Sequence, residues 1–177
     1  MSAETPSAGR TGRGMMIPGL IVLALACALA VAGFVVWGGE DQPSRQEIVA
    51  QRGAKVMPFD LTATTHQFDT TPTGAVELVT ANSAADTTQI DLIREHLLTE
   101  ASRFEQGDFG DPAAIHGNDM PGLRSLANSA GRIDVTYAEV PAGASITFTT
   151  SAPELRSALA DWIMAQNMDH GTGMHHG

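Results

Sequence analysis

The chain has 177 residues, enough for one ordinary domain, and its ten basic and twenty acidic residues give a formal net charge of −10. Most of this charge lies in residues 40–177, where nineteen acidic residues outnumber eight basic ones, so binding to a nucleic-acid backbone is strongly disfavoured. The single cysteine excludes an internal disulfide framework, a CxxC redox pair, a cysteine-based zinc site and a covalent c-type haem.

A long uncharged segment near the N-terminus predicts a transmembrane helix. Residues 15–37 contain no charged side chain, and a bilayer core needs about 20 apolar residues. Two arginines precede the segment and two acidic residues follow it, so the positive-inside rule places residues 1–14 in the cytoplasm and the rest outside. We therefore expect a single-pass protein of the cell membrane, with a disordered cytoplasmic stub over 1–14.

Two alternatives to an uncleaved anchor remain open. Small residues at the usual spacing would allow signal-peptide cleavage after Ala30 or Ala32. Lipid attachment at Cys27 is the weaker alternative, because a poor lipobox precedes it and much apolar sequence follows it.

The remainder of the chain divides into a tether, a domain and a tail. Residues 38–55 are polar and are expected to form a tether, with a short helix that starts near Ser44 and ends at Gly53. Residues 56–171 are expected to form one extracytoplasmic domain. Residues 172–177, which are rich in His and Met, are expected to form a flexible tail.

The first half of the domain predicts two strands followed by a helix. Segments 59–68 and 75–80 have strand-like composition and flank a Pro-Gly turn. Asp86 and Gln89 resemble a capping box, and Gly107 is placed to end the helix that they start.

The second half repeats this order. Segments 132–140 and 144–150 alternate well and flank a turn, which predicts a hairpin. Ser151 and Glu154 resemble a second capping box. The apolar face of the last helix is expected to carry Leu155, Leu159, Trp162, Ile163 and Gln166. The predicted fold is α+β, of ββα-ββα type, with an antiparallel sheet and helices on one face.

A connector of unusual length, residues 107–131, joins the two halves. Loops this long in compact domains are usually functional or contain short helices, and Phe109, Ile115, Leu123 and Leu126 are too apolar to leave in water. We therefore expect the connector to be ordered and packed.

Four stretches carry a family resemblance: VMPFDLTATTH, QIDLIREHLLTEASRF, GDFGDPAAIHGNDMPGL and the terminal DHG. Together they resemble a family of small bacterial membrane-anchored proteins that are often labelled aspartate carbamoyltransferase. The resemblance covers 56–171 and implies an envelope protein. The label itself is not carried over, because the chain contains neither a Ser-Thr-Arg-Thr loop nor a His-Pro-x-x-Gln segment.

Histidine and methionine residues give the sharpest functional hypothesis. A metal site is predicted from His116, Asp119, Met120, His170, His175 and His176. Mixed imidazole and thioether ligands suit copper, with thioether favouring Cu(I). The alternative is that Met120 fills a gap in the core and that His175 and His176 bind metals only adventitiously.

The other polar residues have plainer explanations. His66 is expected to be a half-buried structural residue of the first strand. His96 is expected to lie on the flank of the helix, where Glu100 at i+4 can accept a hydrogen bond from its ring N–H. Asp108, Asp111 and Asp119 do not form an EF-hand calcium site, because they lack the DxDxDG order and the terminal Glu of that motif.

No catalytic motif of the common classes is present: the chain lacks GxSxG, HExxH, Walker and GxGxxG sequences. The sequence therefore favours a non-enzymatic binding or accessory module of the cell envelope, with copper as a possible ligand. A small transferase or hydrolase is the alternative. A further alternative is a subunit of a membrane complex, in which small residues of the span contact a partner protein.

Overall fold

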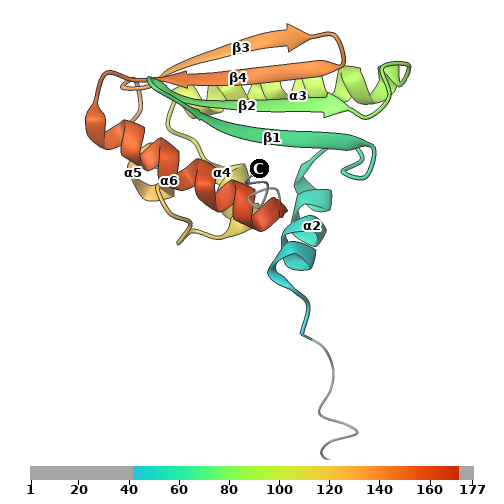
Figure 1. Ribbon diagram of the computed structural model, residues 1–177, viewed down its shortest axis with the longest axis horizontal. Helices are drawn as coiled ribbons and strands as arrows, with labels where there is room; N and C mark the ends of the chain where they lie inside the picture. Colours follow the sequence, from blue (N-terminus) through green and yellow to red (C-terminus); the bar gives the residue numbers. More distant parts are fainter. Residues whose placement is uncertain (1–41, 172–177) are drawn as a thin grey trace, which may run out of the picture. The chain divides into compact units, whose positions relative to one another are not determined.

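A computed structural model describes residues 42–171, which form a four-stranded antiparallel sheet with helices on one face (Figure 1). The predicted α+β class and antiparallel sheet are confirmed. No helix within 42–171 is long and apolar enough to cross a membrane. The predicted span, 15–37, and the tail, 172–177, lie outside the described residues.

Two β-hairpins form the sheet and meet at its centre. The strands are β1 (Thr64–Thr71), β2 (Gly74–Ala81), β3 (Asp134–Val140) and β4 (Gly143–Thr149), in the order β1-β2-β4-β3. The central pair joins Gly74 to Thr149 at one end and Thr80 to Gly143 at the other. A Cβ atom at either glycine would lie 2.0 Å from a carbonyl oxygen of the opposite strand, so only glycine permits this close approach.

The first strand starts at Thr64, later than the predicted Phe59. Residues 58–63 instead form bends and a turn, in which the Asp60 carboxylate accepts hydrogen bonds from the backbone N–H and the hydroxyl of Thr62, each at 2.8 Å. An aspartate that bonds the backbone two residues on competes with strand pairing. The Phe59 ring is nevertheless buried.

The long helices α3 (Thr87–Glu105) and α6 (Pro153–His170) cover the sheet. Asp86 caps α3, as predicted, by accepting from the Gln89 N–H. The Gln89 side chain does not complete a capping box, however, because it accepts a hydrogen bond from the Asp60 N–H. The second predicted capping box is wrong.

At the start of α6, the N-cap is Ala152 rather than Ser151, and no side chain caps this end. Glu154 pairs with Arg132 and does not complete a capping box. Pro153 occupies the first turn, where its missing N–H is harmless.

The predicted tether contains a packed helix, α2 (Arg45–Val56), which is a correction to the expectation for 38–55. Ser44 and Glu47 form a complete capping box, and the helix continues past Gly53. Val49 and Gly53 are buried where α2 packs against α4 and α6. The compact unit accordingly begins at Pro43 rather than at Val56.

The connector is ordered, as predicted, and contains two short helices, α4 (Gly110–His116) and α5 (Leu123–Ala127). The four connector side chains that were expected to be buried are each at least 95% buried: Phe109, Ile115, Leu123 and Leu126. The Phe109 ring stacks on Phe104 of α3, with centroids 4.7 Å apart. This packing fixes α4, and with it His116.

Candidate functional site

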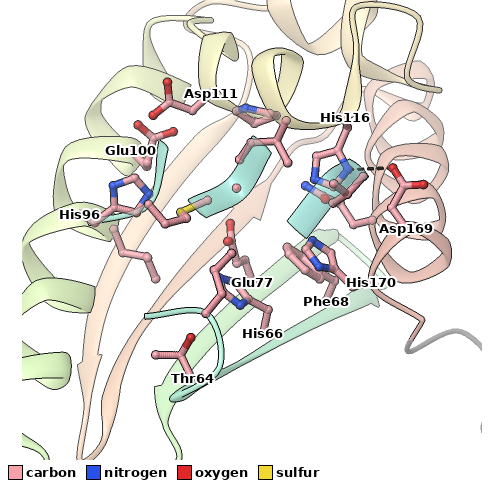
Figure 2. Close-up of a pocket in the computed structure, with 18 of the residues that line it drawn as sticks. Thr64, His66, Phe68, Glu77, His96, Glu100, Asp111, His116, Asp169 and His170 are labelled. Carbon is pink, nitrogen blue, oxygen red and sulfur yellow. Dashed lines mark hydrogen bonds and ion pairs between the residues drawn. The ribbon is translucent and has the colours of Figure 1, made fainter. Parts of the chain in front are cut away.

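A cavity of about 420 Å³ lies between the sheet and the helices that cover it (Figure 2). Ligand sites of small molecules start at about 300 Å³. Strands β1, β2 and β4 form its floor, and α2, α3, α4 and α6 form its walls. The loop after α2 adds Met57, Phe59 and Leu61.

Simple periodicities direct the polar side chains into this cavity. On β1, Thr64, His66 and Phe68 share one face because alternate residues of a strand point the same way. Phe68 lies opposite Glu77 of β2 in the antiparallel register, so the Glu77 side chain joins the same face. On α6, Trp162 and Gln166 are one helical turn apart and face inward together.

All four histidines of the described chain line the cavity: His66, His96, His116 and His170. They come from β1, α3, α4 and α6, respectively. The ring centroids of His116 and His170 are 5.3 Å apart, and those of His66 and His170 are 5.8 Å apart. Residues distant in sequence thus place three imidazoles side by side.

His116 is held by a carboxylate that is itself held by an arginine. Its Nδ1 lies 2.7 Å from Asp169 Oδ2 (Figure 2). Arg45 of α2 donates two hydrogen bonds to the same carboxylate, at 2.8 and 2.7 Å. It also donates to the His116 backbone carbonyl at 2.6 Å. Such bidentate, charge-assisted bonds fix orientation strongly. Burial lowers the His116 pKa, although Asp169 opposes this effect.

The other three imidazoles make no hydrogen bond to any described residue, and aromatic contacts hold them instead. His66 and His170 are parallel within 4°, and Phe59 packs between His66 and His96, with centroids 5.7 and 5.6 Å away. Burial is the main cause of their lowered pKa values, and it brings that of His66 to about 4. These rings are therefore neutral near pH 7.

Carboxyl groups face the cavity as well. Burial, and secondly the nearby Glu100, raises the pKa of Glu77 to about 8. Burial also raises the pKa of Glu100 to about 7, even though its carboxylate accepts from Arg103 at 2.7 Å. Glu77 has no hydrogen bond or ion pair to any described residue, so it is the one cavity carboxyl without a partner there.

Two deeply buried polar atoms on α6 also lack partners within 42–171. They are Trp162 Nε1 and Gln166 Oε1, in side chains that are 0% and 4% exposed. An unpaired buried polar atom loses its hydration without compensation, and natural proteins rarely tolerate this unless another molecule supplies the bond. Both residues line the cavity, so a bound molecule can satisfy them.

The predicted metal-site residues are only partly brought together. His116 and His170 converge, but Asp119 is exposed and Met120 is buried in the hydrophobic core. His175 and His176 lie outside the described residues. Among the residues described, no group of three or more His, Cys, Asp or Glu side chains is arranged to hold a metal ion. Copper binding stays a prediction.

Arg103 pairs with three acidic residues and corrects the expected hydrogen bond between His96 and Glu100. This side chain binds Glu100, Asp108 and Asp111 at 2.7, 2.8 and 2.8 Å, so the two aspartates are explained by an ion-pair cluster. Glu100 therefore bonds Arg103 rather than His96. The α3 turn places Glu100 and Arg103 at i and i+3, a favourable spacing for such a pair.

Sequence reasoning missed Glu77 and the cavity role of His66. The available signal was a single charged residue within the mostly apolar strand 75–80, on the same face as Ala75 and Val79. Comparison with protein-family models, curated proteins and solved structures finds no match to this chain. The resemblance drawn from the sequence therefore stays a prediction.

Proposed function

We propose that this protein is a membrane-anchored, extracytoplasmic binding module that encloses a small organic molecule in the cavity under its sheet. The observation that carries this proposal is the pair of buried, unpartnered polar atoms, Trp162 Nε1 and Gln166 Oε1, in the wall of a cavity of about 420 Å³. The anchor and the outward orientation rest on residues 15–37 and the arginines before them.

The indole N–H resonances of the full-length chain test this proposal. The chain has two tryptophans, so Trp37, outside the domain, serves as an internal reference for Trp162. A library of small polar amines, alcohols, amides and carboxylates is titrated into the protein in detergent. We expect at least one compound to move the Trp162 resonance and leave that of Trp37 unchanged. If no compound does so, the proposal is wrong.

A double variant, Trp162→Phe with Gln166→Leu, supplies the matched test of the site. It removes both unpartnered atoms while retaining most of the buried volume, so the free protein should fold. Binding of the compound found above should weaken at least tenfold, as measured by calorimetry. The control is Gln67→Leu, an exposed residue on the outer face of β1, which should leave binding unchanged.

A second candidate function, acid–base catalysis on the bound molecule, is favoured by the His116–Asp169 hydrogen bond of 2.7 Å. A carboxylate that orients an imidazole is a common feature of general bases. The two functions differ in the fate of the ligand: mass spectrometry after long incubation recovers it unchanged from a binding module and altered from an enzyme.

A further inference from the structure

The cavity wall contains many acids but no permanent cation. Its lining includes four carboxyl residues, Glu77, Glu100, Asp111 and Asp169, and among its described residues there is no lysine and no arginine. Its four imidazoles are neutral near pH 7 because burial lowers their pKa values. An anionic ligand would therefore meet no fixed positive charge in the wall.

Three of these carboxyls are compensated by arginines. Arg103 pairs with Glu100 and Asp111 at 2.7 and 2.8 Å, and Arg45 pairs with Asp169 at 2.7 Å. Glu77 is different, because it faces the cavity from the centre of the sheet without any partner among the residues described (Figure 2). Burial raises the pKa of Glu77 to about 8, so the carboxyl is mostly protonated in the free protein at pH 7. Once it releases that proton, its charge has no protein cation to balance it.

Aromatic side chains line the same space. Phe59, Phe68, Phe104 and Trp162 all line the cavity. Aromatic rings attract organic cations through the negative potential of their faces, and Trp is the strongest of them. A bare metal ion would leave most of about 420 Å³ empty, whereas an organic cation with several carbon atoms fits this space.

The polar atoms of α6 add a second requirement. Trp162 Nε1 is a donor only, so its partner must carry a hydrogen-bond acceptor. Gln166 Oε1 accepts, so an N–H or O–H of the ligand suits it. The negative charge of residues 40–177 favours the approach of cations and disfavours that of anions.

We propose, building on the binding function above, that the cavity selects a small organic cation that also carries an oxygen acceptor. In this arrangement the bound cation displaces the proton of Glu77 to the solvent, and the Glu77 carboxylate becomes its counter-ion. The aromatic rings surround the cationic group, and Trp162 Nε1 donates to the oxygen. Protonated amino alcohols and quaternary ammonium alcohols belong to this chemical class.

Three compounds of nearly the same shape and different charge test the class. Choline is the cation, 3,3-dimethylbutan-1-ol its neutral analogue and 3,3-dimethylbutanoate the anionic one. Binding to the full-length chain in detergent is measured by calorimetry and by the Trp162 indole resonance. We expect choline to bind at least tenfold more tightly than the neutral alcohol, and the anion not to bind.

A variant of the counter-ion sharpens the test. Glu77→Gln has nearly the same shape, so it should fold, which circular dichroism checks. It should reduce the choline affinity at least tenfold while changing that of the alcohol less than twofold. The control Glu95→Gln removes an exposed carboxylate of α3 and should change neither affinity.

The outcomes distinguish a failure of the cation inference from a failure of the proposed binding function. If the alcohol or the anion binds at Trp162 as tightly as choline, the cation inference is wrong and the binding function stands. The inference also fails if Glu77→Gln leaves choline affinity unchanged. If none of the three compounds binds, the inference is again wrong, and the wider library decides whether the binding function fails with it.

Discussion

Gln166 has a buried amide oxygen that lacks a partner among the described residues, although the Gln166 side chain is only 4% exposed. For stability alone, leucine would suit position 166 better, because it fills the same space and has no polar atom that needs a hydrogen bond. If Gln166 serves ligand binding at the expense of stability, its replacement by leucine should stabilise the free protein.

Gln166→Leu should raise the free energy of unfolding of the ligand-free protein by about 1 kcal/mol, because it removes an unsatisfied buried polar group. Denaturant unfolding followed by circular dichroism measures the change. The structural interpretation of Gln166 fails if the variant is destabilised by a similar amount.

Glu77 should make stability depend on pH. Its pKa rises from 4.5 to about 8 on folding, so the folded state holds a proton that the unfolded state releases, and stability falls as the pH rises towards 8. From pH 6.5 to 8, wild type should lose about 2 kcal/mol relative to Glu77→Gln. Unfolding curves of both proteins across this range measure the difference, and parallel curves would contradict it.

The other titratable groups around Glu77 are common to both proteins in that comparison. They are His66 on β1, His96 and Glu100 on α3, Asp111 and His116 on α4, and Asp169 and His170 on α6. The pKa of His66 is about 4, so this residue is neutral in the folded state throughout the range. Glu100, with a pKa of about 7, contributes a slope of its own to both proteins.

At the residue scale, the sequence identified His116 and His170 as partners in one site but not the residues beside them. His116 lies in the connector, which was predicted to pack, and His170 lies at the end of the last predicted helix. His66 and Glu77 reach the cavity only through the β1–β2 register and the position of α6 above it. No local pattern in one sequence contains this register, so a charged residue in a strand was not recognised as part of a site.

At the scale of elements, α2 forms one wall of the cavity and is linked to its neighbours by two arginines. Arg52 donates to the Ile115 carbonyl of α4 at 3.3 Å, and Arg45 makes more contacts. Arg45 donates to Asp169 and to the His116 carbonyl, thereby linking α2 to α6 and α4. The packing of α2 could not be read from its sequence, because only Val49 and Gly53 of the helix are buried and no apolar stripe marks its inner face. Strands β3 and β4 and helix α3 were predicted well because their apolar residues recur with a clear period, whereas β1 starts later than predicted.

Arg45→Met should loosen α2 selectively. The loss of a bidentate, charge-assisted contact should lower the opening free energy of α2 by about 1 kcal/mol. Native-state hydrogen exchange should therefore quicken over 45–56 and stay unchanged in β2 and β4. Arg132→Met breaks an exposed surface pair with Glu154 and serves as the control. Faster exchange throughout the sheet would show that Arg45 supports the whole domain.

At the scale of the whole molecule, the acidic domain follows a segment that is expected to span the membrane. A reporter fused after Gly177 should behave as extracytoplasmic, because both arginines of the first 39 residues precede the apolar segment. Paired reporters that are active only inside or only outside the membrane measure this. A cytoplasmic signal would reverse the topology and place the cavity in the cytoplasm.

The central β2–β4 seam, which closes at Gly74 and Gly143, also governs how the newly made chain reaches its fold. During synthesis the first hairpin emerges well before its partner, and until then β2 presents a free edge of backbone donors and acceptors. A free edge of this kind can pair with other chains. The interval before β4 arrives is therefore the stage at which this domain is most exposed to aggregation, and pairing across large sequence separations makes its folding slow. A side chain at either glycine would clash with a carbonyl oxygen of the opposite strand, so a substitution there would prolong the interval in which β2 is unpaired.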